Sequence, residues 1–214
     1  MYLDDYFFYD PALLDGTPAI MEIGVFTCHK VLTLHEAYPH IRACLVEPDP
    51  GNWETLFRAI SLLPPIVRAC VDPYRYALMP HNGICDFYRY QHQQFHSNFA
   101  RHVNEPEKVL QDVVQVKGVT LPRLLDIAGL KRCDLLLLNC EGAEIYALEA
   151  LLASEELRGR VGQICCSPHC YHVPVYPPKV WDDLMTRLKE LYKVRQGKFK
   201  PIPYFLFAPR AEGT

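Results

Sequence analysis

Several carboxylates and a glycine lie within or directly after apolar runs of this sequence. Residues of these types can bind a charged or hydroxylated ligand. Glu22 and Gly24 belong to the first run, which extends from Ala19 to Lys30. A glycine directly after a strand lets the backbone approach a ligand, and the following helix start offers unpaired N–H groups. Glu22 would be costly to bury without a polar partner. The stretch therefore predicts a site for a nucleotide-like cofactor.

Three histidines are candidates for removing a proton from a hydroxyl group, because an imidazole titrates near neutral pH. His169 follows an apolar run and is expected beside the cleft of a parallel sheet, whereas His92 and His96 lie in a polar segment. Ser97 and Tyr171 are further candidates for contacts to a substrate. A transfer reaction can also proceed largely by proximity and orientation.

A metal site is an alternative use of the residues near His169. Zinc takes Cys and His ligands, which are present as Cys165, Cys166, Cys170 and His172. Their spacing does not match a two-by-two ligand set, and two of the cysteines belong to an apolar run. Magnesium held by Glu141 and neighbouring acids is a second alternative. A divalent metal thus stays open but is not favoured.

Short apolar runs alternate with segments whose apolar residues recur at helical spacing, and this order predicts the strands and helices that position these residues. The first half reads as strand, helix, strand, helix, strand, with helices over 29–38 and 53–63 and strands over 41–46 and 66–71. The order implies parallel strands whose carboxyl ends carry the ligand site. The second half predicts a helix after Thr120, strands over 133–140 and 161–166, an amphipathic helix from 180 to 191, and two antiparallel strands at the sheet edge.

The domain organisation follows from length and from one irregular segment. A chain of 214 residues suits one domain. We expect residues 1–17 to form an N-terminal extension that packs on the core, and residues 18–214 to form the domain. Residues 74–118 break the alternation, although 84–90 alternates like a strand. A lid-like insertion is therefore predicted near 79–112.

Composition excludes several classes of partner. The net charge of −3 provides no electrostatic footprint for nucleic acid or a membrane surface, and no apolar run reaches the length of a membrane span. Nine cysteines, several within apolar runs, are typical of buried reduced thiols. We therefore expect a cytoplasmic protein without a nucleic-acid partner.

Four motifs in order resemble the FkbM-type family of S-adenosylmethionine-dependent methyltransferases. They are the stretch from Met21 to Cys28, the acidic-Pro segment from Leu45 to Pro50, the segment from Thr120 to Leu125, and Leu136 to Glu144. The resemblance covers roughly residues 18–170. It implies an α/β Rossmann-like methyltransferase fold, with a mostly parallel seven-stranded sheet, helices on both faces and an antiparallel edge strand.

The resemblance also implies roles for individual residues. Glu47 would accept hydrogen bonds from the two ribose hydroxyls of S-adenosylmethionine, Glu22 would favour its ammonium or sulfonium group, and Asp72 would accept from adenine. Glu141 and Glu144 would lie where the methyl group meets the acceptor. The remaining predicted cofactor contacts are Gly24, Val25, Phe26, Thr27, Pro48, Asn139 and Cys140.

The resulting prediction is an O-methyltransferase that acts on a hydroxyl of a sugar unit, in a glycan or a glycosylated metabolite. The chain would bind a small-molecule or glycan acceptor and could be one domain of a longer glycan-assembly protein. Cys28 and Asn139 depart from the family pattern, since a glycine and an aspartate are usual there. A catalytically silent binding module and a methyltransferase of a non-sugar natural product are the alternatives.

Overall fold

A seven-stranded sheet forms the centre of the molecule, in the order β3-β2-β1-β7-β8-β10-β9. The computed structural model describes residues 1–3, 7–90, 97, 109–169, 176–197 and 204–210. Five strands run parallel to one another, and β10 runs antiparallel to both of its neighbours, one place in from the edge. The predicted α/β fold class is confirmed. The strands are β1 (Ala19–Ile23), β2 (Arg42–Val46), β3 (Val71–Tyr74), β7 (Cys133–Leu138), β8 (Val161–Cys166), β9 (Tyr192–Gln196) and β10 (Phe205–Pro209).

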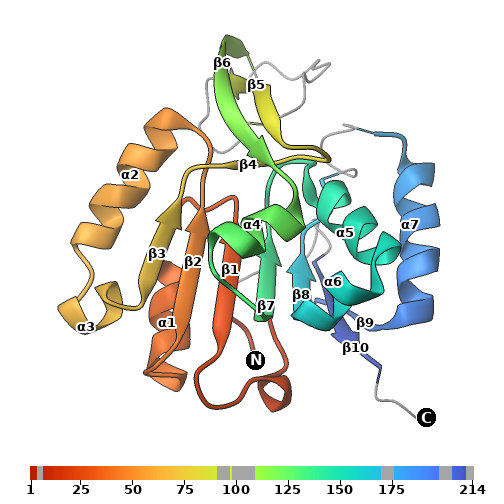
Figure 1. Ribbon diagram of the computed structural model, residues 1–214, viewed down its shortest axis with the longest axis horizontal. Coiled ribbons are helices and arrows are strands. Elements are labelled where there is room, and N and C mark those ends of the chain that lie inside the picture. The colour runs from red at the N-terminus through yellow and green to blue at the C-terminus, as the bar shows by residue number, and fades with distance from the viewer. Residues whose placement is uncertain (4–6, 91–96, 98–108, 170–175, 198–203, 211–214) are drawn as a thin grey trace.

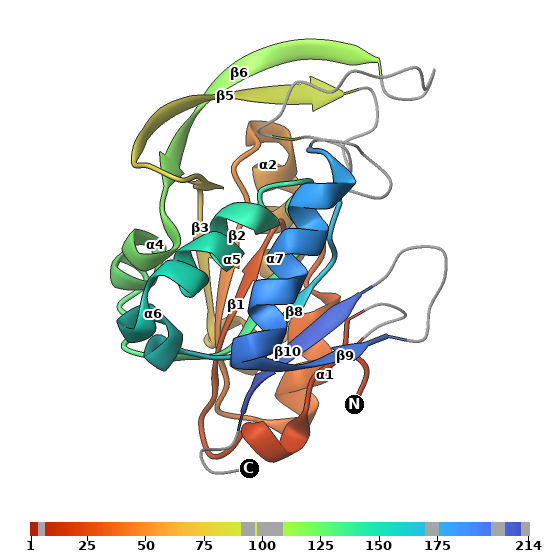
Figure 2. The same ribbon diagram turned by 90° about the vertical axis from the view of Figure 1, so that its right-hand side faces the viewer.

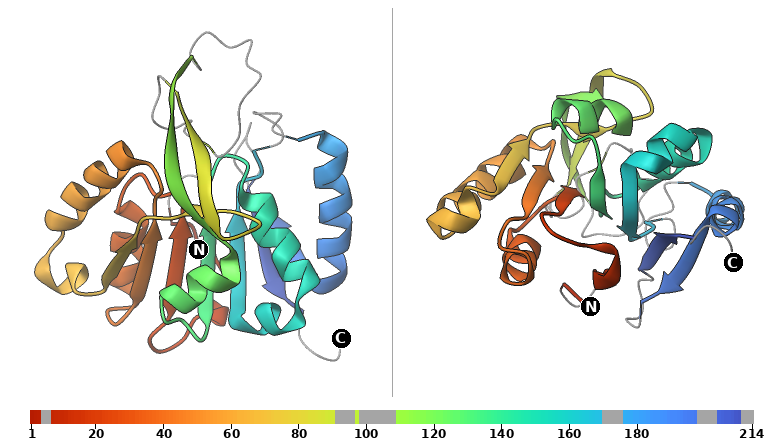
Figure 3. Two further views of the ribbon diagram at one scale, coloured as in Figure 1. Left: turned by 45° about the horizontal axis from the view of Figure 1, so that its top comes forward. Right: turned by 60° about the horizontal axis from the view of Figure 1, so that its bottom comes forward.

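Helices cover both faces of the sheet (Figures 1 and 3). One face packs against α1 (His29–Ala37), α2 (Pro50–Ser61) and α3 (Pro65–Arg68), with side chains such as Val31 and Leu56 in the core. The other face packs against α4 (Leu121–Ile127), α5 (Glu144–Ala153), α6 (Glu155–Arg160) and α7 (Pro178–Leu191). Consecutive side chains of a strand point to opposite faces of the sheet, and in the central strands β1, β2 and β7 nearly all of them are buried, as parallel strands require.

The N-terminal segment closes the core beside α1. Phe7 and Tyr9 are almost fully buried and pack with side chains of β7, β8 and β10. The side-chain amide of Gln163, itself fully buried in β8, accepts a hydrogen bond from the backbone N–H of Asp10 and donates one to its carbonyl oxygen. A short 3-10 helix, η1 (Pro11–Leu13), then leads into β1.

A second sheet, of three strands in the order β4-β6-β5, lies above the carboxyl ends of the parallel strands (Figures 1 and 2). Its strands are β4 (Ala77–Leu78), β5 (Gly83–Tyr90) and β6 (Leu110–Val119). β5 and β6 pair antiparallel over most of their length. The strand-like alternation predicted over 84–90 is confirmed by β5, whereas β6 forms where the sequence predicts irregular chain.

The third strand of the main sheet begins later than predicted. The sequence predicts it over residues 66–71, but Ile66, Val67 and Arg68 belong to α3, and the strand starts at Val71. The reason is Pro65, whose fixed φ and missing N–H suit the first position of a helix. Similarly, α2 starts at Pro50 and not at 53, because the Asp49 side chain caps its N-terminus.

None of the helices in the described part of the chain has the length and apolar character needed to cross a membrane.

Candidate active site

Three strands of the main sheet end at one place. The backbone N–H of Gly24 donates to the carbonyl oxygen of Val46, and that of Asn139 donates to Ile23, so the ends of β2, β1 and β7 are held together. Gly24 has φ +85°, and a Cβ there would overlap the carbonyl oxygen of Asn139. A side chain is therefore excluded at this point, because the backbone at the end of β7 occupies the place of a Cβ.

The turn after Gly24 has one buried and two exposed side chains. Val25 is fully buried, whereas Phe26 and Thr27 are exposed. Cys28 occupies the N-cap position of α1 and is buried among side chains that include Val31. Burial, with a smaller effect of the Glu22 charge, raises the pKa of the Cys28 thiol to about 11. The thiol is thus neutral and belongs to the core.

Glu22, the next-to-last residue of β1, pairs with a residue of α1. Its Oε1 atom lies 2.8 Å from Nζ of Lys30, and both side chains are largely buried. The Lys30 ammonium also lies over the Phe7 ring, 4.6 Å from its centroid. Lys30 thus provides the polar partner that the buried Glu22 carboxylate needs.

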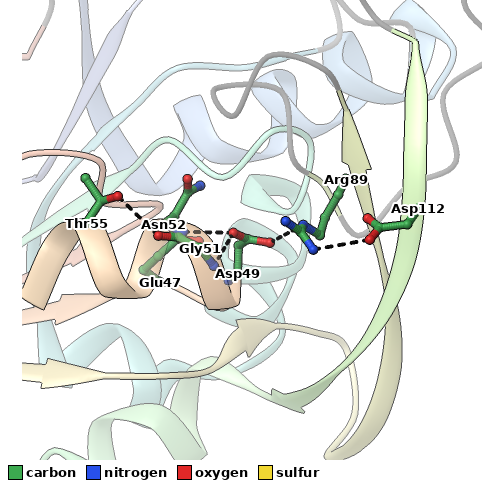
Figure 4. A network of polar contacts seen from close by, with 7 residues as sticks. All are labelled: Glu47, Asp49, Gly51, Asn52, Thr55, Arg89 and Asp112. Atoms are coloured by element: carbon green, nitrogen blue, oxygen red, sulfur yellow. Dashed lines mark hydrogen bonds and ion pairs between the residues drawn. The ribbon is translucent and has the colours of Figure 1, made fainter.

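Glu47 directly follows β2 and is buried. Its Oε1 atom accepts a hydrogen bond of 2.8 Å from the N–H of Asp49, and Asn52 provides another (Figure 4). Burial is the main cause that raises the pKa of Glu47 to about 8, and the Asp49 charge adds to it, although the hydrogen bonds oppose the shift. Pro48, also buried, fixes the backbone between the two acids.

Asp49 is a site residue that the sequence prediction did not include. Its side chain is fully buried, and Oδ1 accepts from the N–H groups of Gly51 and Asn52 at the start of α2. Oδ2 lies 3.1 Å from Nε of Arg89 in β5, which also pairs with Asp112 in β6 (Figure 4). Asp49 followed by Pro50 is a helix-start signal, from which the N-cap of α2 could have been predicted. No local pattern identifies Arg89.

The expectation that Asp72 closes the third strand is wrong. Asp72 is the second residue of β3, which continues to Tyr74. Its carboxylate pairs with Nε of Arg42 at 3.1 Å, and both side chains are almost half exposed. Because Arg42 is the first residue of β2, this pair lies toward the amino ends of the strands. The premise for an adenine contact from Asp72 therefore fails.

His169, in the segment after β8, lies between the carboxylates of Glu141 and Glu144, which follow β7. Nε2 of His169 lies 3.0 Å from Oε1 of Glu141, and Nδ1 lies 2.9 Å from Oε1 of Glu144. Glu144 is fully buried and also accepts from the backbone N–H groups of Cys140 and Gly142. Glu141 has φ +53°, a left-handed conformation that is rare without glycine and is typical of functional sites.

These contacts determine the charge of His169. Burial alone would lower its pKa, but the carboxylates of Glu141 and Glu144 raise it to about 10. Both ring nitrogens therefore donate, and the ring is an imidazolium at neutral pH. The role of His169 as a general base stays a prediction; the two carboxylates favour the protonated ring, whereas a base needs the neutral ring. The three side chains together carry a formal charge of −1.

Methyltransferases are among the solved structures with this strand arrangement. Precorrin-6y C5,15-methyltransferase from Geobacter metallireducens has a TM-score of 0.50 and 11% identity, over 92% of this chain and 82% of that one. Human methyltransferase-like protein 13 in complex with SAH has a TM-score of 0.53 and 12% identity, over 95% and 79%. The chain has the Rossmann-like methyltransferase fold. Methanococcus jannaschii fibrillarin, a pre-rRNA processing protein, has a TM-score of 0.52 and 9% identity, over 90% and 66%.

No protein-family model and no curated protein sequence matches this methyltransferase-fold chain. At these identities the likeness concerns the fold. The FkbM-type subfamily therefore remains a prediction, and so does the expectation that nucleic acid is not a partner, since a fibrillarin is among the structures that match.

The methyltransferase fold brings most of the predicted site residues to one edge of the sheet. Asn139 and Cys140 follow β7 directly, and both are partly buried. The buried Ser97 donates its hydroxyl hydrogen to the carbonyl oxygen of Glu141 at 2.8 Å. Within the described residues, no group of three or more His, Cys, Asp or Glu side chains is arranged to hold a metal ion. Some residues from the sequence predictions lie outside the described part, namely His92, His96, Cys170, Tyr171 and His172.

Proposed function

We propose that this chain is an S-adenosylmethionine-dependent O-methyltransferase that acts on a hydroxyl group of a sugar unit. The observation that carries the proposal is the buried carboxylate of Glu47 at the end of β2, beside a strand end where Gly24 excludes a Cβ. In dinucleotide-binding folds, an acidic residue at the corresponding strand end accepts hydrogen bonds from ribose.

The residues of this edge suit the parts of S-adenosylmethionine. Glu47 offers a carboxylate to the ribose hydroxyls, and the turn from Gly24 to Thr27 offers backbone groups next to the start of α1. Asn139 and Cys140 line the end of the neighbouring strand. Glu22 is engaged with Lys30 and supports the turn from beneath it. Asp72 is left out of the proposed site.

The acidic group around His169 suits the chemistry of the transfer. When bound, S-adenosylmethionine supplies a methyl group on a positively charged sulfur. A fixed negative charge nearby favours that cation, and carboxylates stabilise the positive charge that develops on an acceptor oxygen. Glu141, whose side chain keeps 14% of its surface exposed, would take the hydroxyl proton. The His169 imidazolium and the left-handed backbone would hold that carboxylate in place.

The choice of a sugar hydroxyl rests on the resemblance of residues 18–170 to the FkbM-type family. A divalent metal is not needed for this chemistry, since the proton acceptor and the fixed charges come from the protein. A cytoplasmic location and membership of a longer glycan-assembly protein remain part of the same proposal.

Isothermal titration with S-adenosylhomocysteine (SAH) tests the cofactor site. We expect wild-type protein and a Glu149→Gln control to bind alike, because Glu149 pairs with Arg187 on the helical surface. Above pH 8, where wild-type Glu47 is ionised, Glu47→Gln should bind at least tenfold more weakly, because it lacks the carboxylate. A wild-type protein that binds neither SAH nor S-adenosylmethionine would refute the proposal.

Incubation with S-adenosylmethionine and a panel of glycans, followed by mass spectrometry, tests the acceptor. We expect a mass gain of one methyl group, which Glu141→Gln should reduce by about 10²-fold or more, the usual range for a lost proton acceptor. Methylation of structured RNA in a parallel sample, without methylation of any glycan, would show that the acceptor is RNA and not a sugar unit. Binding without transfer to any acceptor would favour the silent module that Cys28 and Asn139 suggest.

A further inference from the structure

Two consecutive residues of β5 reach opposite sides of the candidate site. Tyr88 exchanges two backbone hydrogen bonds with Ser97, of 2.7 and 3.0 Å, and the Ser97 hydroxyl donates to the carbonyl oxygen of Glu141. The next residue, Arg89, pairs with Asp49 in the loop after β2. One strand of the small sheet therefore links the loop that carries Glu47 to the loop that carries Glu141.

Several hydrogen bonds hold the cofactor side of this link together. The Asp49 N–H donates to Glu47, and the Asp49 carboxylate accepts from the first N–H groups of α2. Glu47 and Asp49 are thus parts of one hydrogen-bonded turn. Arg89 approaches its far side, where Oδ2 of Asp49 points away from Glu47 (Figure 4). The Glu47 carboxylate and the Arg89 guanidinium are thus both in contact with Asp49.

The charges make this contact costly to lose. Asp49 is fully buried, and a buried carboxylate without a cation is strongly disfavoured. Arg89 retains 28% of its side-chain exposure and also contacts Asp112, which is half exposed. The Asp112 contact is on the solvent side and is screened, so it contributes little. Of the two pairs, the one with Asp49 holds β5 against the cofactor side.

We propose that Arg89 is a positioning residue that couples occupation of the cofactor site at Glu47 to the placement of Glu141 through β5. This inference rests on the proposed function. Coupling between two sites is reciprocal, so the guanidinium that fixes β5 also increases cofactor affinity. The small sheet would then be part of the methyl-transfer site and not a separate appendage.

The test combines SAH titration with hydrogen exchange on four proteins. Wild type is compared with Arg89→Met, which keeps the length but removes the charge, with Arg89→Lys, which restores the charge, and with Asp112→Asn as a matched control. Hydrogen exchange is followed in peptides over 83–90, 110–119 and 139–145, with and without SAH.

We expect SAH to slow exchange in all three wild-type peptides and in Asp112→Asn, whose SAH affinity should stay within twofold. In Arg89→Met, SAH affinity should fall about tenfold and the response of the 139–145 peptide should disappear, even at saturating SAH. Arg89→Lys should recover part of both, because an ammonium supplies charge without the guanidinium geometry.

A purely structural role for Arg89 would give a different result. Arg89→Met would then unfold at a lower temperature, but saturating SAH would still protect the 139–145 peptide, and that outcome overturns the coupling. Wild-type protein that binds SAH without any response in 139–145 overturns it as well and leaves the proposed function intact. Wild-type protein that binds no SAH overturns both.

Discussion

Nε2 of His169 lies 3.0 Å from Oε1 of Glu141, and this contact makes the histidine a fixed cation. The pKa of His169 is raised to about 10 from an ordinary value near 6.5. The ring therefore stabilises the folded protein fully below pH 6.5, and this contribution is lost as the pH rises through 10.

Replacement of His169 by Gln should remove that contribution. The buried carboxylate of Glu144 and the nearby Glu141 would lose their cation, which we expect to lower the free energy of unfolding at pH 7 by about 3–5 kcal/mol. Urea unfolding of both proteins at pH 6, 8 and 10 measures the difference. It should be largest at pH 6 and smallest at pH 10, and a difference independent of pH would contradict the imidazolium.

Glu47 should make SAH binding depend on pH. Its pKa in the folded protein is raised to about 8, so at pH 7 most molecules carry a neutral carboxyl group there. Ribose hydroxyls donate better to a carboxylate, so SAH affinity should rise between pH 6 and 8, by at most about tenfold per unit, and level off above. Glu47→Gln should show a weaker and flat profile. A flat profile in the wild type would mean that Glu47 does not meet the ribose as an anion.

The same group has an opposite effect on stability. A raised pKa means that the folded state binds the proton more tightly than the unfolded chain, whose Glu titrates near 4.5. The stabilisation is complete below pH 4.5 and is lost as the pH rises through 8. Unfolding curves of Glu47→Gln, which stays neutral, should therefore be less dependent on pH over this window than those of wild type. If the unfolding free energies of the two proteins change equally with pH, the group that titrates in this window is not Glu47.

Gly24→Ala should abolish cofactor binding at a clear cost in stability. The new Cβ would collide with the backbone of Asn139, and the left-handed φ alone costs about 1–2 kcal/mol. Gly16→Ala is the matched control, because Gly16 also has positive φ but a Cβ there would meet no neighbouring atom within 4 Å. Thermal unfolding and SAH titration should show a larger loss for Gly24→Ala in both. Equal losses of stability in the two variants would show that the positive φ, and not the collision with Asn139, causes the destabilisation of Gly24→Ala.

Cys28→Ala should leave SAH affinity within twofold of wild type. The Cys28 side chain packs in the core beneath α1, so its thiol does not narrow the turn after Gly24. The smaller side chain should lower the unfolding free energy by about 1 kcal/mol, as expected for a small buried deletion. A clear change in SAH affinity would show instead that this departure from the FkbM-type pattern affects the cofactor site.

Local sequence patterns predict most of the main sheet. The strand over 161–166 has its predicted limits, and all six of its residues are buried, including the polar Gln163. The strand predicted over 66–71 is wrong, since a run of six residues fits either a strand or a short helix, and Pro65 decides for the helix. The sequence prediction missed the strand over 110–119, whose first four residues are exposed, although Val114 to Lys117 alternates between apolar and polar side chains.

The site is predictable in position but not in charge. Glu47 and His169 are expected at strand ends, because parallel strands carry their ligand sites there. The protonation of His169 depends on Glu141 and Glu144, whose contacts with both ring nitrogens require the folded loops. The pair of Asp49 and Arg89 joins the loop after β2 to β5 of the small sheet. Such a contact has no signature in spacing, and only the folded chain shows it.

The small sheet enters and leaves the main domain at neighbouring points. Ala77 lies opposite Gly118, and Leu78 opposite Val119. A segment with adjacent ends can change in length and composition at little entropic cost to the rest of the fold. Natural variation could therefore change the rest of this segment, provided that Tyr88, Arg89 and Ser97 keep their contacts. Evolution would then have one short stretch in which to change acceptor preference while the cofactor machinery is inherited unchanged.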